Sequence, residues 1–347
     1  MTIPNVFICV DFIESTSVSA GTSRPLANPW GRMSDLRRIR SAWLPFLQKY
    51  QGLAGLFLLV IVAAFVEPRF LTGPNLANVM NQLAIPGTLA LGMTFVILTG
   101  GIDLSVGSLF ALLNCVTASW LRDGTALHWT VLYVLFLGTA IGALLGATVT
   151  YTRMQAFVVT LGAMVSLRGI AYVYSDGSFI SGLGQSMAPL QAKWGEVPLS
   201  AVVIVAATLL AALLLAKTRF GREVYAIGGN EEAARLSGIG VAKTRIAAYA
   251  INGLCVALAA LMFTAKTNNG QHSAGIGYEL DAIAGAVVGG TSLLGGYGQA
   301  TGTFVGSLFI VSIGVLMQLK GINTQVGMGF KGIIILIAVY LQNLGRR

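Results

Sequence analysis

Residues 217–245 read KTRFGREVYAIGGNEEAARLSGIGVAKTR and separate two long apolar runs, at 199–216 and 246–265. The stretch is the one long polar interruption in the second half of the chain. Six of the 22 lysine and arginine residues lie in it. A charged segment between two apolar runs is typical of a hydrophilic loop that joins two membrane-spanning helices.

A short helix is predicted at the centre of this loop, and the sequence specifies both of its ends. Asn230 is a favourable N-cap, and acidic residues in the first turn interact favourably with the helix dipole. Gly238 can adopt the left-handed conformation that ends many helices. The residues between the two caps are Glu231, Glu232, Ala233, Ala234, Arg235 and Leu236. Because so short a helix is marginal alone in water, the loop is either a solvated connection packed on its own membrane domain or a docking element for a soluble partner.

The composition of the chain indicates a membrane protein. Hydrophobic residues make up 55% of the 347 residues and charged residues 10%, whereas soluble domains carry about 25% charged residues. The net charge of +9 does not indicate nucleic-acid binding, since no basic stripe with interleaved aromatic residues occurs. The three cysteines show no paired spacing, so neither a disulfide framework nor a metal framework is implied.

The arrangement of apolar runs predicts an all-α, polytopic membrane protein of about ten spans, each near the roughly 20 residues that cross a bilayer. The predicted spans are 44–66, 76–98, 104–121, 129–149, 155–175, 199–216, 246–265, 280–297, 300–318 and 329–344. The second contains Pro86, and the eighth is crowded with glycine. Such residues at membrane depth mark either broken helices that line a cavity or helices that pack closely through small residues.

Residues 1–42 differ from the rest of the chain, because they are rich in Ser, Thr, Asn, Pro and Arg and show no sustained apolar period. This composition predicts a disordered cytoplasmic tail. Met33 is a plausible alternative start of translation. The membrane domain is then 43–347. A weak similarity between 100–110 and 295–309 favours a duplicated architecture, although glycine-rich sequence could produce it by itself.

The distribution of lysine and arginine predicts the orientation of the spans. An even number of spans puts both termini on one side, together with the loop near Arg153 and the 217–245 loop. That side carries 14 lysine and arginine residues outside the spans and the opposite side five. The five are Arg69, Arg122, Lys193, Lys266 and Lys320. Since cytoplasmic loops are enriched in basic residues, both termini and the 217–245 loop are expected in the cytoplasm.

The loop helix and two glycine-rich stretches resemble a known family. GNEEAARLSGI at 229–239 resembles the coupling loop of ABC-transporter permeases, the subunits that form the translocation path of ATP-driven importers. TGGIDLSVGS at 99–108 and VGGTSLLGGYG at 288–298 resemble the signature stretches of the ribose/xylose/galactose-type permeases. The resemblance covers about 43 to the C-terminus. The residues it suggests for the pathway are Gly100, Gly101, Asp103, Ser105, Gly289, Gly290, Gly295 and Gly296.

The resemblance implies a bacterial inner-membrane importer of a monosaccharide such as ribose. It implies an ATPase dimer beneath two permease chains, expected to be identical, and a periplasmic sugar-binding protein that delivers the solute. No cofactor is expected in this chain, because ATP and Mg²⁺ would bind the ATPase subunit. A pathway lined by glycine and weakly polar side chains suits a neutral sugar that another protein has already selected.

The sequence offers no candidate for catalysis. The segment 238–244 is a near miss to a phosphate-binding loop, but it lacks the glycine before the lysine, so ATP hydrolysis by this chain is not expected. The two histidines, His128 and His272, are interpreted as solvated loop residues. Asp103 either accepts backbone hydrogen bonds at the start of its span or serves as a proton relay or substrate contact. Arg168 is expected to have an inward-facing structural partner or to snorkel.

Two other classes of function remain open. A proton- or sodium-coupled secondary transporter would require acidic residues deep within the spans, and Asp103 is expected near a span end. A structural membrane scaffold would leave the capped loop helix unexplained.

Overall fold

The computed structural model describes residues 52–195 and 197–322, together with 329, 332, 333 and 336. The predicted tail at 1–42, the beginning of the first span and most of the tenth span lie outside the described residues and stay predictions. The chain divides into two units, Met1–Trp43 and Leu44–Arg347, and every described residue belongs to the second.

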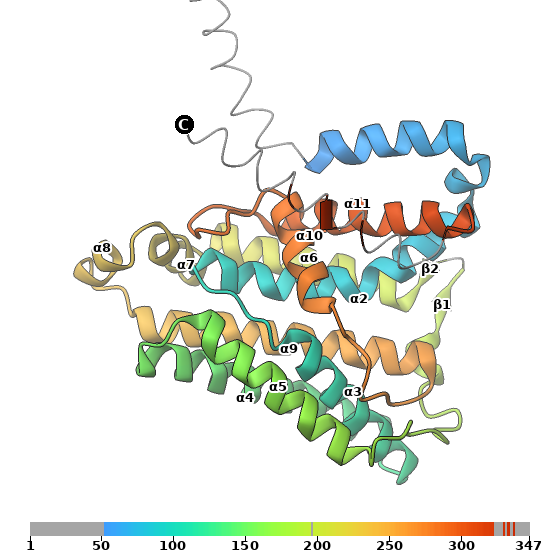
Figure 1. Cartoon of the computed structure of the whole chain (residues 1–347), viewed down its shortest axis with the longest axis horizontal. Coiled ribbons are helices and arrows are strands. Elements are labelled where there is room, and N and C mark those ends of the chain that lie inside the picture. Colours follow the sequence, from blue (N-terminus) through green and yellow to red (C-terminus); the bar gives the residue numbers. More distant parts are fainter. Residues whose placement is uncertain (1–51, 196, 323–328, 330–331, 334–335, 337–347) are drawn as a thin grey trace, which may run out of the picture. The chain divides into compact units, whose positions relative to one another are not determined.

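Helices form nearly all the regular structure of the described part, which confirms the all-α prediction (Figure 1). They are the helix Gly52–Val66, η1 (Pro68–Leu71), α2 (Gly73–Leu98), α3 (Val106–Arg122), α4 (Leu127–Thr152), α5 (Ala156–Tyr174), η2 (Ala188–Gln191), α6 (Leu199–Lys217), α7 (Arg219–Gly229), α8 (Glu231–Leu236), α9 (Val241–Thr267), α10 (Tyr278–Val288) and α11 (Ala300–Leu319). Strands β1 (Lys193–Trp194) and β2 (Val197–Pro198) pair in an antiparallel hairpin.

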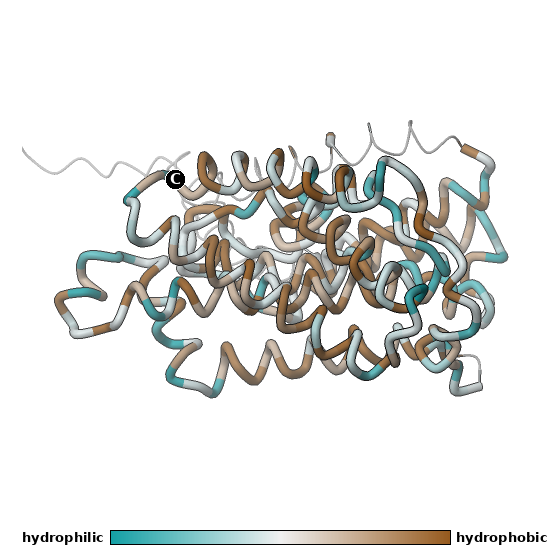
Figure 2. The backbone as a smooth tube through the Cα atoms, turned by 90° about the horizontal axis from the view of Figure 1, so that it is seen from below, coloured by the Kyte–Doolittle hydropathy of each residue, from teal (hydrophilic) through white to brown (hydrophobic). Residues whose placement is uncertain are grey.

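Six described helices, α2, α4, α5, α6, α9 and α11, are long and apolar enough to cross a membrane. Hydrophobic residues predominate along the long helices, and hydrophilic residues gather at the turns between helices (Figure 2). The helix Gly52–Val66 and α3 are also apolar but shorter. These eight helices correspond to the first seven predicted spans and the ninth, so the chain is a polytopic membrane protein.

The eighth predicted span, 280–297, is wrong as a single helix. Helix α10 has 11 residues and ends at Val288, so it is shorter than the roughly 20 residues that cross a bilayer. Gly290 has a φ of +92°. Its N–H donates to the Val287 carbonyl (2.9 Å), and the next N–H donates to the Ala286 carbonyl (2.9 Å). This pair of bonds terminates a helix at a left-handed glycine, and the chain then forms the turn at 289–299.

Pro86 does not break α2, which continues through it as one helix of 26 residues. In the apolar part of α2, 83% of the residues are buried, against 17% for α5. Helix α2 is therefore a central helix, and α5 lies at the periphery.

Glycines allow α4 and α9 to pack with their backbones close together. Gly138, Gly142 and Gly146 recur every four residues on α4, and all three face α9. A Cβ at Gly142 would overlap the Tyr249 carbonyl, and one at Gly138 would lie 2.7 Å from the Gly253 carbonyl. Close approach through small residues is a common way to associate membrane helices.

The turns between helices form two groups. Helix α8, the α4–α5 turn and the 289–299 turn lie at one end of the helices, here called the α8 end, and the β1–β2 hairpin lies at the opposite end (Figure 1). Arg153 and the 217–245 loop line a single pocket at the α8 end. The Lys320 side chain forms an ion pair with Glu67 at 3.3 Å. This pair joins the loop near Arg69 to the loop near Lys320, both of which the sequence predicts on the side of the membrane opposite the 217–245 loop.

Candidate functional site

Helix α8 has a cap at each end that involves the predicted residues. The Asn230 side chain accepts a hydrogen bond from the Ala233 N–H at 2.9 Å. Gly238 has a φ of +80°; its N–H donates to the Arg235 carbonyl (3.0 Å) and the Ile239 N–H to the Ala234 carbonyl (3.1 Å). Local bonds thus fix both ends of a helix of six residues.

Most of α8 faces away from the rest of the protein. Ala234 is buried on the protein side, with 4% of its surface exposed, whereas Ala233 is exposed. Leu236 is 81% exposed although it lies among hydrophilic residues. Glu232 and Arg235 form an exposed ion pair at 2.5 Å. Ala233 and Leu236, three residues apart, are thus both exposed on the side of α8 that faces away from the protein.

Two interactions hold α8 and α7 against the start of α9. Glu231 pairs with Arg245 at 2.5 Å, and the Arg245 side chain is only 16% exposed. Glu223 of α7 accepts a hydrogen bond from the Thr244 hydroxyl at 2.8 Å. This bond, together with one from Arg219, lowers the pKa of the Glu223 carboxyl below its usual value. The loop is therefore an ordered unit of two short helices, of which the sequence predicts only α8.

Gly228, near the end of α7, brings two of the predicted glycine-rich stretches together. A Cβ on Gly228 would overlap both the Leu98 carbonyl and the Gly296 N–H. The Gly296 N–H donates to the Leu98 carbonyl at 3.0 Å, and a Cβ on Gly295 would lie 2.9 Å from the Gly100 nitrogen. The main chain of α7 thus touches the segments that lead into α3 and α11.

Asp103 lies deeper, in a buried polar cluster before α3. It is 2% exposed, and its Oδ1 accepts hydrogen bonds from the N–H (2.9 Å) and the hydroxyl (2.6 Å) of Ser105. The expected backbone bond is therefore present. Asp103 lies three residues before the start of α3, as the sequence predicts, but this start is buried inside the protein. Beside it, the Cβ position of Gly101 lies 2.8 Å from the Tyr249 hydroxyl.

The remaining signature glycines, Gly289 and Gly290, lie apart from Gly228. They end α10, and a Cβ on Gly289 would overlap the Gly302 carbonyl of α11. In the stretch 288–298, Gly289 therefore allows α10 to pack closely on α11, and Gly290 ends α10.

Arg168 holds the irregular segment between α9 and α10. Its Nη1 donates to the carbonyls of His272 and Ala274, each at 2.7 Å, which gives it the inward-facing structural partner that the sequence predicts. The His272 ring packs edge-on against Tyr172. His272 is half-buried, so its interpretation as a solvated loop residue is wrong. His128 is exposed as expected, but it lies in the first turn of α4 and not in a loop.

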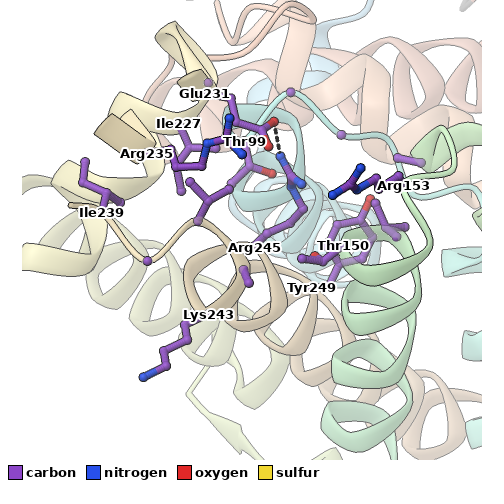
Figure 3. A pocket seen from close by; sticks show the side chains of 18 of the residues that line it. Thr99, Thr150, Arg153, Ile227, Glu231, Arg235, Ile239, Lys243, Arg245 and Tyr249 are labelled. Atoms are coloured by element: carbon purple, nitrogen blue, oxygen red, sulfur yellow. Dashed lines mark hydrogen bonds and ion pairs between the residues drawn. The ribbon is translucent and has the colours of Figure 1, made fainter. Parts of the chain in front are cut away.

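A pocket of about 930 Å³ opens at the α8 end (Figure 3). The coupling candidates Glu231 and Arg235 line it together with the signature residues Gly100 and Gly101. The α4–α5 turn and the start of α9 complete the wall. The pocket is the place where the predicted loop helix and the first signature stretch meet.

Sequence reasoning missed four residues that build this region: Gly228, Arg245, Tyr249 and Asn252. The adjacent glycines Gly228 and Gly229, and an asparagine inside the apolar run 246–265, are signals that could have indicated two of them. Their partners lie far away in the sequence, so the pairings themselves leave no local pattern.

The comparisons with known proteins agree with this architecture. Residues 75–339 match the family described as branched-chain amino acid transport system / permease component. The ribose import permease protein of Bacillus subtilis (strain 168) is 42% identical over 298 residues, which cover 85% of this chain and 92% of that protein. The ribose import permease protein of Escherichia coli (strain K12) is 40% identical over 316 residues, 90% of this chain and 98% of that protein.

The xylose transport system permease protein of Escherichia coli (strain K12) is 36% identical, covering 81% of this chain and 88% of that protein. No solved structure matches the chain. The family match extends over most of the chain, and the relatives align over nearly their whole length. This chain therefore belongs to the family of branched-chain amino acid transport system permease components, alongside the ribose and xylose permeases.

Proposed function

We propose that this chain is the permease subunit of an ATP-binding-cassette importer that takes up a ribose-type monosaccharide. The similarity to ribose and xylose permeases supports the substrate class. A periplasmic binding protein delivers the sugar, and two copies of the chain form the pathway across the bacterial inner membrane. ATP and Mg²⁺ bind a separate ATPase subunit, so this chain is not itself an enzyme.

The single observation that carries the proposal is the exposed side of α8. A helix of six residues with caps at both ends presents Leu236, 81% exposed, at the hydrophilic end of the protein. We assign Asn230, Glu231, Glu232, Ala233, Ala234, Arg235, Leu236 and Gly238 to this coupling element. The ATPase binds the side with Ala233 and Leu236, which lie three residues apart and therefore on one face.

The contacts behind α8 supply a route from the ATPase to the spans. The Glu231–Arg245 pair links α8 to α9, and Gly228 of α7 touches main-chain atoms of Leu98 and Gly296, next to the contact of Gly295 with Gly100. A displacement of α8 is thereby passed to the segments that precede α3 and α11. The pathway candidates are the signature residues Gly100, Gly101, Asp103, Ser105, Gly289, Gly290, Gly295 and Gly296.

The test replaces Leu236 with aspartate, which places an unpaired charge in the interface with the ATPase. We expect normal membrane insertion, a loss of ATPase co-purification of more than about tenfold, and a parallel loss of vanadate-sensitive sugar uptake. The matched control is Val197→Asp, the same chemical change at an exposed apolar residue of the β1–β2 hairpin. The control should retain the ATPase. Wild-type uptake by Leu236→Asp would exclude α8 as the coupling element.

The orientation is tested independently. Both termini and the 217–245 loop are cytoplasmic in this proposal, in agreement with the excess of basic residues. Single cysteines at Lys193 and Lys243, in a cysteine-free background, should react with an impermeant reagent from outside and inside the cell, respectively. Labelling of position 243 from outside intact cells would overturn the orientation.

A further inference from the structure

The pocket at the α8 end is lined by more positive charge than passage of a neutral sugar requires. Its cationic lining residues are Arg153, Arg235, Lys243 and Arg245, and among its lining residues only Glu231 is acidic. Glu231 is already paired with Arg245, and Arg235 is paired with Glu232. Lys243 points away from the other side chains (Figure 3). Among the described residues, Arg153 is therefore the cation that faces the pocket without an acidic partner, and Arg245 shares its charge with Glu231.

Arg153 extends across the pocket toward Arg245, whose guanidinium group points to Glu231 (Figure 3). Arg153 follows α4 and makes no hydrogen bond or ion pair with the described part of the chain. Arg245 belongs to α9, and 16% of its side chain is exposed. The positive charge of Arg153 has no counter-ion within the described residues, so it attracts an anion into the pocket, and the Arg245 nitrogens that do not contact Glu231 can donate to the same anion. A phosphate group matches the planar donor geometry of guanidinium groups.

The backbone of Arg153 supports a functional role for this side chain. Its φ of +58° lies in the left-handed region, which is uncommon for a residue with a Cβ. Left-handed residues other than glycine are concentrated at functional sites, where the surrounding structure maintains the strain. The conformation directs a cationic side chain, in place of a glycine, over the pocket.

Tyr249 provides a third donor in the pocket wall. It is fully buried, it lines the pocket, and its hydroxyl has no hydrogen-bond partner within the described residues. A buried hydroxyl without a partner costs free energy. A ligand oxygen that accepts a hydrogen bond from this hydroxyl removes the cost.

We propose that this pocket binds a phosphate group, held by Arg153, Arg245 and the hydroxyl of Tyr249. The group belongs to a small phosphate ester or to a phospholipid headgroup, which share this chemistry. The volume of about 930 Å³ falls within the range of small-molecule sites, about 300–1,000 Å³. Bound phosphate links the α4–α5 turn to the start of α9, immediately behind α8, and so restrains the coupling element of the proposed function.

The test is a titration of the purified, delipidated full chain with inorganic phosphate, by isothermal calorimetry, with chloride keeping the ionic strength constant. We expect saturable binding with which sulfate competes. Arg153→Asn should weaken binding about tenfold or more, the loss expected for one charged hydrogen bond. Asparagine tolerates the left-handed backbone, so this variant removes the charge without adding strain.

Two further variants separate a site from a general charge effect. Tyr249→Phe removes only a hydroxyl that has no protein partner, so its melting temperature without phosphate should stay at the wild-type value while its phosphate affinity falls. Arg222→Gln removes one exposed arginine of α7 that does not line the pocket, and its affinity should be unchanged. The proposal is overturned if the wild type shows no saturable binding, if Arg153→Asn and Tyr249→Phe both bind phosphate like the wild type, or if Arg222→Gln loses as much affinity as these two variants.

The same titration in lipid nanodiscs identifies the source of the phosphate. Discs of phosphatidylglycerol and discs of a galactolipid without phosphate are compared. Loss of phosphate binding only in phosphatidylglycerol assigns the pocket to a lipid headgroup. Binding in both discs, with competition by glycerol phosphate, assigns it to a soluble phosphate ester.

Discussion

Asp103 Oδ2 accepts a 2.8 Å hydrogen bond from Asn252 Nδ2, which joins the loop before α3 to the helix that follows α8. The two residues are 149 positions apart. The Oδ1 of Asn252 is buried and has no partner in the described part of the chain. The loop and α9 are therefore held together by an amide group that retains one unused acceptor.

This unused acceptor predicts that Asp103→Asn is tolerated. Rotation of the Asn252 amide by half a turn presents its oxygen to the new amide nitrogen at position 103, and the bonds from Ser105 are kept by the remaining oxygen. Sugar uptake and the melting temperature should stay near wild type. Abolished uptake by a variant that still inserts in the membrane would favour a proton-coupled secondary transporter, for which the buried Asp103 is the relevant acid.

Asp103→Ala, by contrast, should be destabilising. It leaves buried donors of Ser105 and Asn252 without an acceptor, at about 1–3 kcal/mol for each unsatisfied group. The melting temperature in detergent should therefore fall well below that of Asp103→Asn.

Substitution by alanine should be harmful at Gly228 and harmless at Gly229, the next residue of α7. In Gly228→Ala the new methyl group would overlap main-chain atoms of Leu98 and Gly296, whereas no atom lies within 4 Å of a Cβ at Gly229. Overpacking of this kind costs about 1–3 kcal/mol, so Gly228→Ala should lower both the melting temperature and sugar uptake. Gly229→Ala is the matched control and should leave both intact. Equal behaviour of the two variants would contradict the observed packing.

Arg168→Met should loosen the segment between α9 and α10. Methionine retains the apolar stem but removes the donor that serves the carbonyls of His272 and Ala274. Hydrogen bonds to charged groups contribute about 1.5–3 kcal/mol each, so the melting temperature and uptake should both fall. Arg168→Lys keeps a charged donor and should restore part of the loss. If Arg168→Met melts and transports like wild type, the two bonds do not position this segment.

Glu67 predicts a pH dependence of stability at the hairpin end. The hydrogen bond from the Arg69 side chain (2.8 Å), with Lys320 adding to it, lowers the pKa of the Glu67 carboxyl from 4.5 to about 2. A lowered pKa stabilises the folded state above the unfolded value, and this stabilisation disappears as the pH falls through the folded value.

The melting temperatures of wild type and Glu67→Gln should therefore differ by a constant amount above a pH of about 4.5 and converge as the pH approaches about 2. Asp123→Asn, in an exposed ion pair with Arg122, is the control, and it should change the melting temperature little because such pairs contribute little. A Glu67→Gln difference that persists unchanged at the acidic end would contradict the lowered pKa.

The parts of this structure that the sequence predicts are those that nearby residues determine. Both caps of α8 involve residues within a few positions of one another, and the long apolar runs specify most of the spans. Arg168 could be expected to face inward because a charged side chain inside a membrane requires a partner. For the caps and the spans, the physical cause and its consequence lie in one short segment, whereas for Arg168 the sequence indicates the need for a partner but not which residues supply it.

The sequence fails where contacts between distant segments decide the outcome. The run 280–297 is apolar enough for a span, but the left-handed Gly290 ends the helix, and the turn that follows is held against α7 and Leu98. The burial of Asp103 depends on an asparagine 149 positions away. Helix α7 was missed because its polar sequence resembles an ordinary loop.

The contact of Gly228 with Leu98 and Gly296 has a mechanical consequence, because it joins main chain to main chain. Side chains at an interface can absorb a displacement by changing rotamer, so a contact made by side chains transmits only part of a movement. Peptide groups have no rotamers and few soft degrees of freedom. A displacement of α7 at this contact is therefore transmitted to Leu98 and Gly296 at nearly its full amplitude. A single added methyl group at Gly228 would prevent the close approach on which this transmission depends.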